Sequence, residues 1–89
     1  MSNASDFIIE NSVLVKYTGS SAKVRIPDGV TEIGNGAFDR KYNLSSVSFP
    51  EGITVLGPAA FRDCQQLRSV TLPKRLKVIG ESCFVGCWL

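Results

Sequence analysis

The chain has 89 residues, of which 44% are hydrophobic and 20% charged, a balance typical of one small globular domain rather than a disordered segment. Its formal net charge of +2 is too small to favour a nucleic-acid partner, which needs a dense basic surface. The sequence contains no histidine, which removes the Ser-His and Cys-His pairs of common hydrolases, and no apolar run reaches the roughly 20 residues that span a bilayer.

Residues 1–5 are predicted to be the remnant of an expression tag, since Met1 is followed by Ser2-Asn3-Ala4. No signal peptide is visible, but if the natural N-terminus is missing, this observation says nothing about whether the protein is exported. Residues 6–23 predict a cap and linker. Two β-prone apolar runs flank Glu10-Asn11-Ser12, a turn-forming cluster, so we expect a β-hairpin that covers the open end of the first repeat.

A segment that ends in proline recurs at a constant spacing through the rest of the chain. Val24-Arg25-Ile26-Pro27 returns as Val47-Ser48-Phe49-Pro50 and again as Val70-Thr71-Leu72-Pro73, each time 23 residues later. The same offset relates further columns: Val30, Ile53 and Leu76; Ile33, Leu56 and Ile79; Gly34, Gly57 and Gly80; Ala37, Ala60 and Cys83; Phe38, Phe61 and Phe84; Leu44 and Leu67. We therefore expect three structural repeats, at 24–46, 47–69 and 70–89.

The residue type in each column predicts its role. An apolar residue alternating with a polar one predicts a short strand with one buried face, and the following proline ends it because it has no N–H to donate. The next apolar pair, Val30 and Ile33 in the first repeat, predicts a second extended segment. The glycine after it, Gly34, predicts either a positive φ or a close backbone approach. The small residues before Phe38 predict a short helical or 3₁₀ turn that places the ring in the core, and Pro58 is well suited to start that turn in the second repeat.

One such unit cannot bury its own apolar face, whereas stacked units can, with like residues about 4.8 Å apart where strands pair. The predicted fold is therefore a β-solenoid of about three 23-residue coils with short helical or 3₁₀ turns, capped by an N-terminal β-hairpin. No equivalent cap follows the third repeat, which stops at Trp88-Leu89. We expect this end to continue as a longer array or to be covered by another molecule, and a homodimer through it is one alternative.

The residues from Ile26-Pro27 to Ala37-Phe38, and again from Phe49-Pro50 through Cys64 to Ser69-Val70, resemble the BspA-like leucine-rich repeat family. The resemblance covers essentially all of 6–89, with departures at Lys41, where the family prefers cysteine, and at Gly36, where alanine is common. It implies a leucine-rich repeat fold and no catalytic residues. It also implies a bacterial surface or secreted protein, several relatives of which take part in adhesion to host matrix or other microbes.

The three cysteines, Cys64, Cys83 and Cys87, are best explained by packing. Cys64 and Cys87 share a repeat column, and a free thiol behaves as a small buried hydrophobe. A disulfide between stacked columns is the alternative, and a metal site is disfavoured because only three thiols and no histidine are present. We predict no metal, no cofactor and no enzymatic activity, since the acids lie scattered at turn positions.

The variable outward positions are the candidate partner-binding residues. They comprise the strand position Arg25, the polar column Thr31, Thr54 and Lys77, the column Glu32, Val55 and Val78, the basic pair Lys74 and Arg75, and Trp88. The basic cluster of the third repeat contrasts with acids at equivalent turns, Asp28 and Glu51, and suits an acidic partner. Two valines at an outward column would form a small apolar patch, and tryptophan is frequent at binding hot spots.

These observations favour a non-catalytic extracellular or cell-surface module that binds a protein or glycan partner through the outer surface of the repeats, with no nucleic acid and no membrane span. The alternative is a structural spacer within a larger surface protein, with no ligand of its own.

Overall fold

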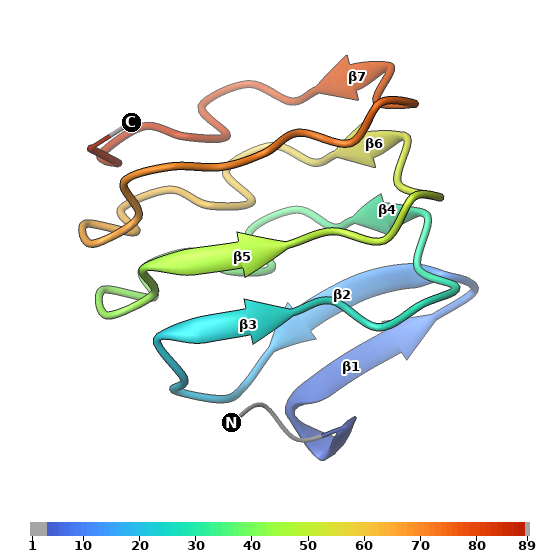
Figure 1. Cartoon of the computed structure of the whole chain (residues 1–89), viewed down its shortest axis with the longest axis horizontal. Helices are drawn as coiled ribbons and strands as arrows, with labels where there is room; N and C mark the ends of the chain where they lie inside the picture. Colours follow the sequence, from blue (N-terminus) through green and yellow to red (C-terminus); the bar gives the residue numbers. More distant parts are fainter. Residues whose placement is uncertain (1–3, 89) are drawn as a thin grey trace.

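The chain is rich in strands and has almost no helix. The computed structural model describes residues 4–88, in which a 3₁₀ turn is followed by seven strands that form two separate sheets (Figure 1). The elements are η1 (Ala4–Asp6), β1 (Phe7–Glu10), β2 (Val13–Tyr17), β3 (Lys23–Arg25), β4 (Glu32–Ile33), β5 (Ser46–Ser48), β6 (Val55–Leu56) and β7 (Val78–Ile79). Most of the predicted tag remnant, Met1 to Asn3, lies outside the described residues. No helix among the described residues is long and apolar enough to cross a membrane.

The predicted hairpin is present at the start of the chain. Strands β1 and β2 pair antiparallel, and Asn11 and Ser12 between them have φ of 51° and 66°, the two left-handed residues of a tight hairpin turn. Strand β2 then pairs in parallel with β4, with Leu14 opposite Ile33. The hairpin therefore joins the first repeat as its lower neighbour, as expected of a cap.

The second extended segments of the three repeats form the other strands of a five-stranded sheet, ordered β1-β2-β4-β6-β7. The pairing is parallel and keeps the 23-residue offset, so Ile33, Leu56 and Ile79 share one column. Ile33 and Leu56 are fully buried, because each lies between neighbours in this column, whereas Ile79 in the last strand is 49% exposed.

The glycine that follows each of these strands serves close backbone approach. The Gly57 N–H donates to the Ile33 carbonyl at 2.7 Å, and a Cβ on Gly57 would lie only 2.7 Å from that oxygen. Gly34 has the same relation to Leu14, at 2.8 Å for the hydrogen bond and 2.9 Å for the added Cβ. Gly34, Gly57 and Gly80 have no left-handed φ, so of the two predicted explanations for this glycine column, close backbone approach is the one that applies.

The first strands of the repeats form a separate two-stranded sheet, β3 and β5. They pair in parallel with Val24 opposite Val47, both buried. The predicted third strand at Val70-Thr71-Leu72 is wrong, since this segment is irregular. Its apolar face lacks the cover that holds β3 and β5 in place, and Leu72 is 43% exposed whereas the equivalent Ile26 is 1% exposed.

The predicted helical or 3₁₀ turn before each core phenylalanine is also wrong. The segments are successive β-turns, as in the Ala37 N–H to Gly34 carbonyl bond of 3.2 Å and the Asp39 N–H to Gly36 carbonyl bond of 3.0 Å. One column of left-handed residues accounts for this: Gly36, Ala59 and Ser82 have φ of 65°, 55° and 60°. A right-handed helix cannot contain such a residue.

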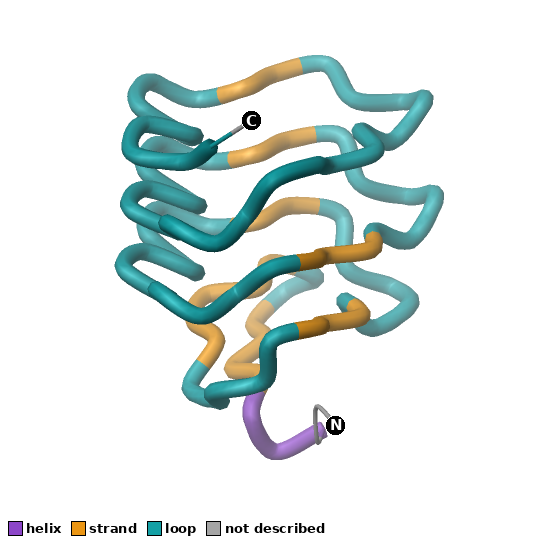
Figure 2. The backbone as a smooth tube through the Cα atoms, turned by 60° about the vertical axis from the view of Figure 1, so that its left-hand side comes forward, coloured by secondary structure: helices purple, strands orange, loops and turns teal. Residues whose placement is uncertain are grey.

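The turns stack through hydrogen bonds that run between repeats. The Phe38 N–H donates to the Ala60 carbonyl at 2.7 Å, and the Phe61 N–H donates to the Cys83 carbonyl at 2.9 Å. Here the earlier repeat donates to the later one, whereas at Gly57 the later repeat donates to the earlier. Figure 2 shows the loops of successive repeats lying one above another.

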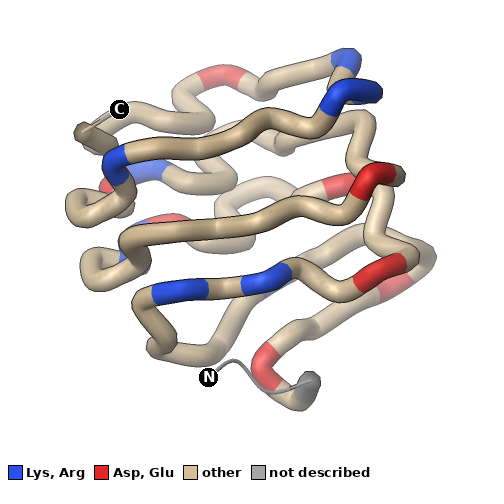
Figure 3. The backbone as a smooth tube through the Cα atoms, in the orientation of Figure 1, with Lys and Arg blue, Asp and Glu red and all other residues tan. Residues whose placement is uncertain are grey.

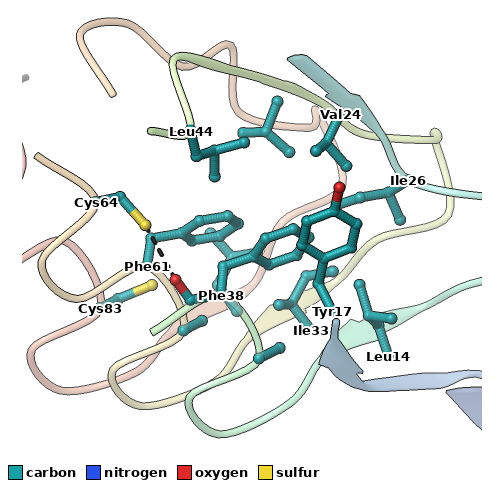
Figure 4. Close-up of a cluster of buried hydrophobic side chains, with 14 of the residues drawn as sticks. Leu14, Tyr17, Val24, Ile26, Ile33, Phe38, Leu44, Phe61, Cys64 and Cys83 are labelled. Carbon is teal, nitrogen blue, oxygen red and sulfur yellow. Dashed lines mark hydrogen bonds between the residues drawn. The ribbon is translucent and has the colours of Figure 1, made fainter. Parts of the chain in front are cut away.

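The core is a stack of aromatic rings with aliphatic side chains around it (Figure 4). Ring centroids lie 5.0 Å apart from Tyr17 to Phe38, 5.0 Å from Phe38 to Phe61 and 5.5 Å from Phe61 to Phe84. The predicted ladder of phenylalanines is confirmed, and the hairpin extends it through Tyr17. Leu44 and Leu67 form the second predicted ladder, both fully buried.

Candidate functional site

Two of the predicted outward columns run side by side along the five-stranded sheet. The first column lies directly before the strands and consists of Thr31, Thr54 and Lys77. The Thr54 backbone N–H donates to the Thr31 carbonyl at 2.9 Å, and the Lys77 backbone N–H donates to the Thr54 carbonyl at 2.8 Å. The next column, Glu32, Val55 and Val78, alternates with the buried one and faces outward, with Val78 51% exposed. The structure therefore places six predicted residues on one surface, a polar row beside a mainly apolar row.

Arg25 lies on a different surface. It is exposed on β3, opposite Ser48 of β5, and belongs to the two-stranded sheet. The third member of its predicted column, Thr71, is exposed but lies outside any strand. Arg25 and the threonine column are therefore separated by the turn at Asp28-Gly29, and they do not form one continuous patch.

Lys74 and Arg75 form the equivalent turn in the third repeat. Acidic residues stand at the same turn in the repeats below, Asp28 and Glu51, so the charge changes sign along the stack (Figure 3). Lys74 and Arg75 border a groove of about 360 Å³ between the second and third repeats. The other residues that line it are Phe49, Pro50, Glu51, Thr71, Leu72 and Pro73. The sequence pattern does not predict this groove, because it predicts a regular strand at Thr71 and Leu72, which line the groove.

Trp88 lies apart from the other candidates. Its side chain is 73% exposed, and the Trp88 backbone N–H donates to the Leu67 carbonyl at 3.2 Å. By repeat offset it belongs to a column with Gln65 and Tyr42, and Tyr42 is also 53% exposed. The ring thus faces outward from the segment that follows the last turn, and it does not close the last repeat. Its neighbour Leu89 lies outside the described residues.

Stacked parallel strands at a 23-residue offset, with an apolar ladder on the inner side, are typical of a repeat protein. The sequence profile of the BspA type leucine-rich repeat region, which contains six copies, matches residues 7–89. The chain belongs to this family. A search of curated proteins and a search of solved structures each found no significant match. BspA-type leucine-rich repeat proteins are typically surface-associated, and their repeats are generally non-catalytic.

The cysteines of this BspA-type chain are packing residues with protonated thiols. Cys64 and Cys83 are buried, Cys87 is half-buried, and all three are free. The Cys64 Sγ donates to the Phe38 carbonyl at 3.1 Å, and the Cys87 Sγ donates to the Phe61 carbonyl at 3.0 Å. Burial raises the pKa of Cys64 to about 12 and also raises the pKa of Cys83 and Cys87. A protonated thiol is a weak nucleophile and a poor metal ligand. Within residues 4–88, no group of three acidic or sulfur ligands is arranged to hold a metal ion.

Lys41 replaces the cysteine that the BspA-type pattern favours in this column, and the structure explains how. Its Nζ donates to the Gly19 carbonyl at 3.1 Å and lies 5.4 Å from the centre of the Tyr17 ring. The neighbour below the first repeat is the hairpin and its linker, so a longer side chain is needed to reach a carbonyl there.

A bidentate ion pair was missed by the sequence analysis. The Arg62 guanidinium donates to both carboxylate oxygens of Asp39, at 3.1 and 2.8 Å, and the hydrogen bond and opposite charge raise the pKa of Arg62. The two residues are 23 positions apart, so the repeat offset could have indicated the pair. The pair links the first and second repeats and leaves neither charge free for a partner.

Proposed function

We propose that the chain is a non-catalytic, extracellular binding or adhesion module, built as a solenoid of three closed coils and recognising a protein or glycan through its outer surface. The observation that carries the proposal is the pair of outward columns on the five-stranded sheet. Stacked backbone bonds hold Thr31, Thr54 and Lys77 in a fixed row beside Val55 and Val78. Such a row offers hydrogen-bonding and apolar groups at regular spacing, with little conformational freedom to lose on binding.

Family membership supports a surface location, since proteins of this type are typically surface-associated. The absence of histidine and the protonated state of the thiols support a role without catalysis.

The test is binding of the purified chain to immobilised extracellular-matrix proteins and to a glycan array. A row variant, Thr54→Asp with Val55→Asp and Val78→Asp, should lose binding, since it places carboxylates across both columns. A matched control with the same three added charges, Ser46→Asp, Ser48→Asp and Thr71→Asp, changes β5 and the equivalent segment of the third repeat and should retain binding. Circular dichroism would establish that both variants are folded.

Retention of binding by the row variant would contradict the assignment of this surface. Absence of binding to every matrix protein and glycan would favour a spacer with no ligand of its own.

Self-association through the third repeat is a separate proposal. Val78, Ile79 and Trp88 there are each about half exposed or more, and apolar surface of this kind favours association. Light scattering across concentration, beside a Trp88→Ser variant, tests it: a dimer that the variant breaks supports it, and a monomer in both refutes it.

A further inference from the structure

Two large aromatic side chains are exposed at equivalent positions of the stack. Trp88 and Tyr42 are both more than half exposed, and they share the column that Gln65 occupies in the second repeat. Tyr42 and Gln65 stand at the second position of β-turns, as in the turn closed by the Leu67 N–H to Cys64 carbonyl bond of 3.1 Å. Neither aromatic ring belongs to the core, so packing does not explain this exposed pair.

A hollow of about 470 Å³ lies beside Trp88, between the second and third repeats. Besides Trp88, it is lined by Asp63, Gln65, Gly86 and Cys87. Gly86 has a φ of 83°, and a Cβ there would overlap the Asp63 carboxylate, so glycine leaves room for that side chain. Between residues 4 and 88, no side-chain hydrogen bond or ion pair engages Asp63 or Gln65. The hollow therefore offers one aromatic wall and two polar side chains that a ligand can hydrogen-bond.

This combination of side chains suits a sugar. A pyranose ring with equatorial hydroxyl groups has flat faces of C–H groups, which pack on an aromatic ring, while the hydroxyl groups at its edge need hydrogen-bond partners. Gln65 supplies a donor and an acceptor, and Asp63 supplies acceptors for hydroxyl protons. The Asp63 carboxylate also disfavours an acidic ligand, and the neighbouring cation, Arg62, is already paired with Asp39. A neutral sugar therefore fits the hollow better than an acidic one.

The column sets the direction in which a sugar chain would run. Tyr42 and Trp88 are two repeats apart, which places their backbones about 10 Å from each other along the stack at the usual spacing of paired strands. The ring centroids of the core phenylalanines, 5.0 and 5.5 Å apart from one repeat to the next, agree with this spacing. An extended chain of β-linked sugars can thus contact both rings and pass Gln65 between them.

We infer that the column of Tyr42, Gln65 and Trp88, together with Asp63, binds a neutral, extended, β-linked oligosaccharide that runs along the stack. One sugar ring packs on Trp88 and another on Tyr42, and hydroxyl groups hydrogen-bond to Gln65 and Asp63. This inference rests on the proposed binding function, of which it takes the glycan alternative. It adds a surface separate from the outward columns of the five-stranded sheet.

Trp88 is the only tryptophan of the chain, so tryptophan fluorescence reports on this site alone. The probes are cellohexaose, which is neutral, and the hexamer of β1→4-linked glucuronate, the same chain with a carboxylate on every sugar. Titrations use protein concentrations at which light scattering shows a monomer. Cellohexaose should shift the emission to shorter wavelength and reduce quenching by iodide, and the glucuronate hexamer should bind roughly threefold more weakly. Emission that cellohexaose leaves unchanged, or equal affinity for the two probes, would overturn the inference.

Variants of the two rings test whether the sugar follows the column. In isothermal titration calorimetry, Trp88→Ser should weaken cellohexaose binding roughly tenfold and Tyr42→Ser about fivefold. The matched control, Val78→Ser, removes an exposed apolar side chain from the five-stranded sheet and should change the affinity by less than about twofold. The disaccharide cellobiose reaches only one ring, so Trp88→Ser should weaken its binding and Tyr42→Ser should not. Equal effects of Tyr42→Ser and Val78→Ser on cellohexaose binding would contradict the inference.

Asp63→Asn tests the preference for a neutral sugar. Asp63 has a φ of 59°, which asparagine also tolerates, so the turn is kept. This variant should bind the glucuronate hexamer about threefold more tightly than the unaltered chain does, because the like charge is removed. An unchanged affinity for the glucuronate hexamer would contradict the part assigned to Asp63.

The row variant of the five-stranded sheet separates this inference from the proposed function. If cellohexaose does not bind while binding to matrix proteins persists and depends on Thr54, the proposed function stands and this site is wrong. If the row variant loses cellohexaose binding and Trp88→Ser keeps it, the sugar binds on the sheet, and this site is again wrong. Absence of binding to cellohexaose and to every matrix protein and glycan would remove both proposals.

Discussion

The left-handed column before the core phenylalanines makes a prediction whose sign depends on the local structure. Gly36, Ala59 and Ser82 occupy equivalent positions with φ of 65°, 55° and 60°. Replacing Ala59 by glycine should therefore stabilise the chain, and replacing Gly36 by alanine should destabilise it. In a helical turn both signs would be reversed, since glycine in a helix is about 1 kcal/mol less favourable than alanine.

The magnitude follows from the surroundings of each position. A left-handed φ costs a residue with a Cβ about 1–2 kcal/mol, and the greater freedom of glycine in the unfolded chain offsets about 0.5–1 kcal/mol of this. A Cβ on Gly36 would meet Asp39 Cβ at 3.7 Å, an ordinary contact, so Gly36→Ala reports the backbone effect with no clash. We expect a loss of about 1 kcal/mol there. Ala59→Gly should gain about 0.5 kcal/mol, since it also removes a half-buried methyl group.

Urea unfolding followed by circular dichroism measures both changes. With a slope of about 1 kcal/mol per molar urea, Gly36→Ala should lower the midpoint by about 1 M and Ala59→Gly should raise it by about 0.5 M. The neighbouring Ala60→Gly, at a buried position without left-handed φ, is the control and should lower the midpoint. A lower midpoint for Ala59→Gly together with a higher one for Gly36→Ala would refute the β-turn assignment.

Two further predictions concern close packing and buried thiols. Gly57→Ala should lower the free energy of unfolding by about 2 kcal/mol or more, because its Cβ would lie 2.7 Å from the Ile33 carbonyl oxygen. Gly52→Ala is the control: its Cβ would meet nothing nearer than 3.8 Å, so the change should be less than about 1 kcal/mol. Equal effects of the two substitutions would contradict the close approach at Gly57. The folded pKa of Cys64, raised by burial from 9.0 to about 12, means that the unfolded chain loses this proton first, so its contribution to stability is complete below pH 9 and is lost as pH rises toward 12. Unfolding midpoints between pH 8 and 11 should therefore fall less steeply for Cys64→Ala than for the unaltered chain, and parallel curves would show that this thiol is not shielded.

The sequence predicted correctly the features that depend on the same residue type recurring at the same position of each repeat, or on the residues of one local turn. The 23-residue offset places Phe38, Phe61 and Phe84 in one ladder because any other register would expose the rings. The hairpin was predictable because Asn11 and Ser12 tolerate the left-handed conformation of its turn.

The errors arose where interactions between repeats override local preference. The residues Ala59-Ala60-Phe61 favour a helical turn by themselves, but the Phe61 N–H is used by the Cys83 carbonyl of the next repeat. The segment Val70-Thr71-Leu72 has the same local pattern as the strands below it, yet it forms no strand. Tyr17 was missed as a core ring because it lies 21 residues before Phe38, outside the repeat offset.

Trp88 and the column of Thr31, Thr54 and Lys77 lie on different parts of the surface, and the sequence could not show this. A column assignment tells which residues share a row, but it does not tell where one row lies relative to another around the chain. The groove beside β5 was equally hidden, since the local pattern predicts a regular strand at Thr71 and Leu72, and these residues line the groove without forming one.

The constant offset between paired residues has a consequence for how such a chain can evolve. The strand register between neighbouring repeats keeps a 23-residue offset from the first to the second and from the second to the third, so inserting or deleting a whole 23-residue unit would leave each remaining partner in place. Loss of a single codon within a repeat would displace all the columns that follow it. Duplication by unequal recombination is thus structurally tolerated at this period, and the length of the array is free to vary while the geometry of each unit is conserved.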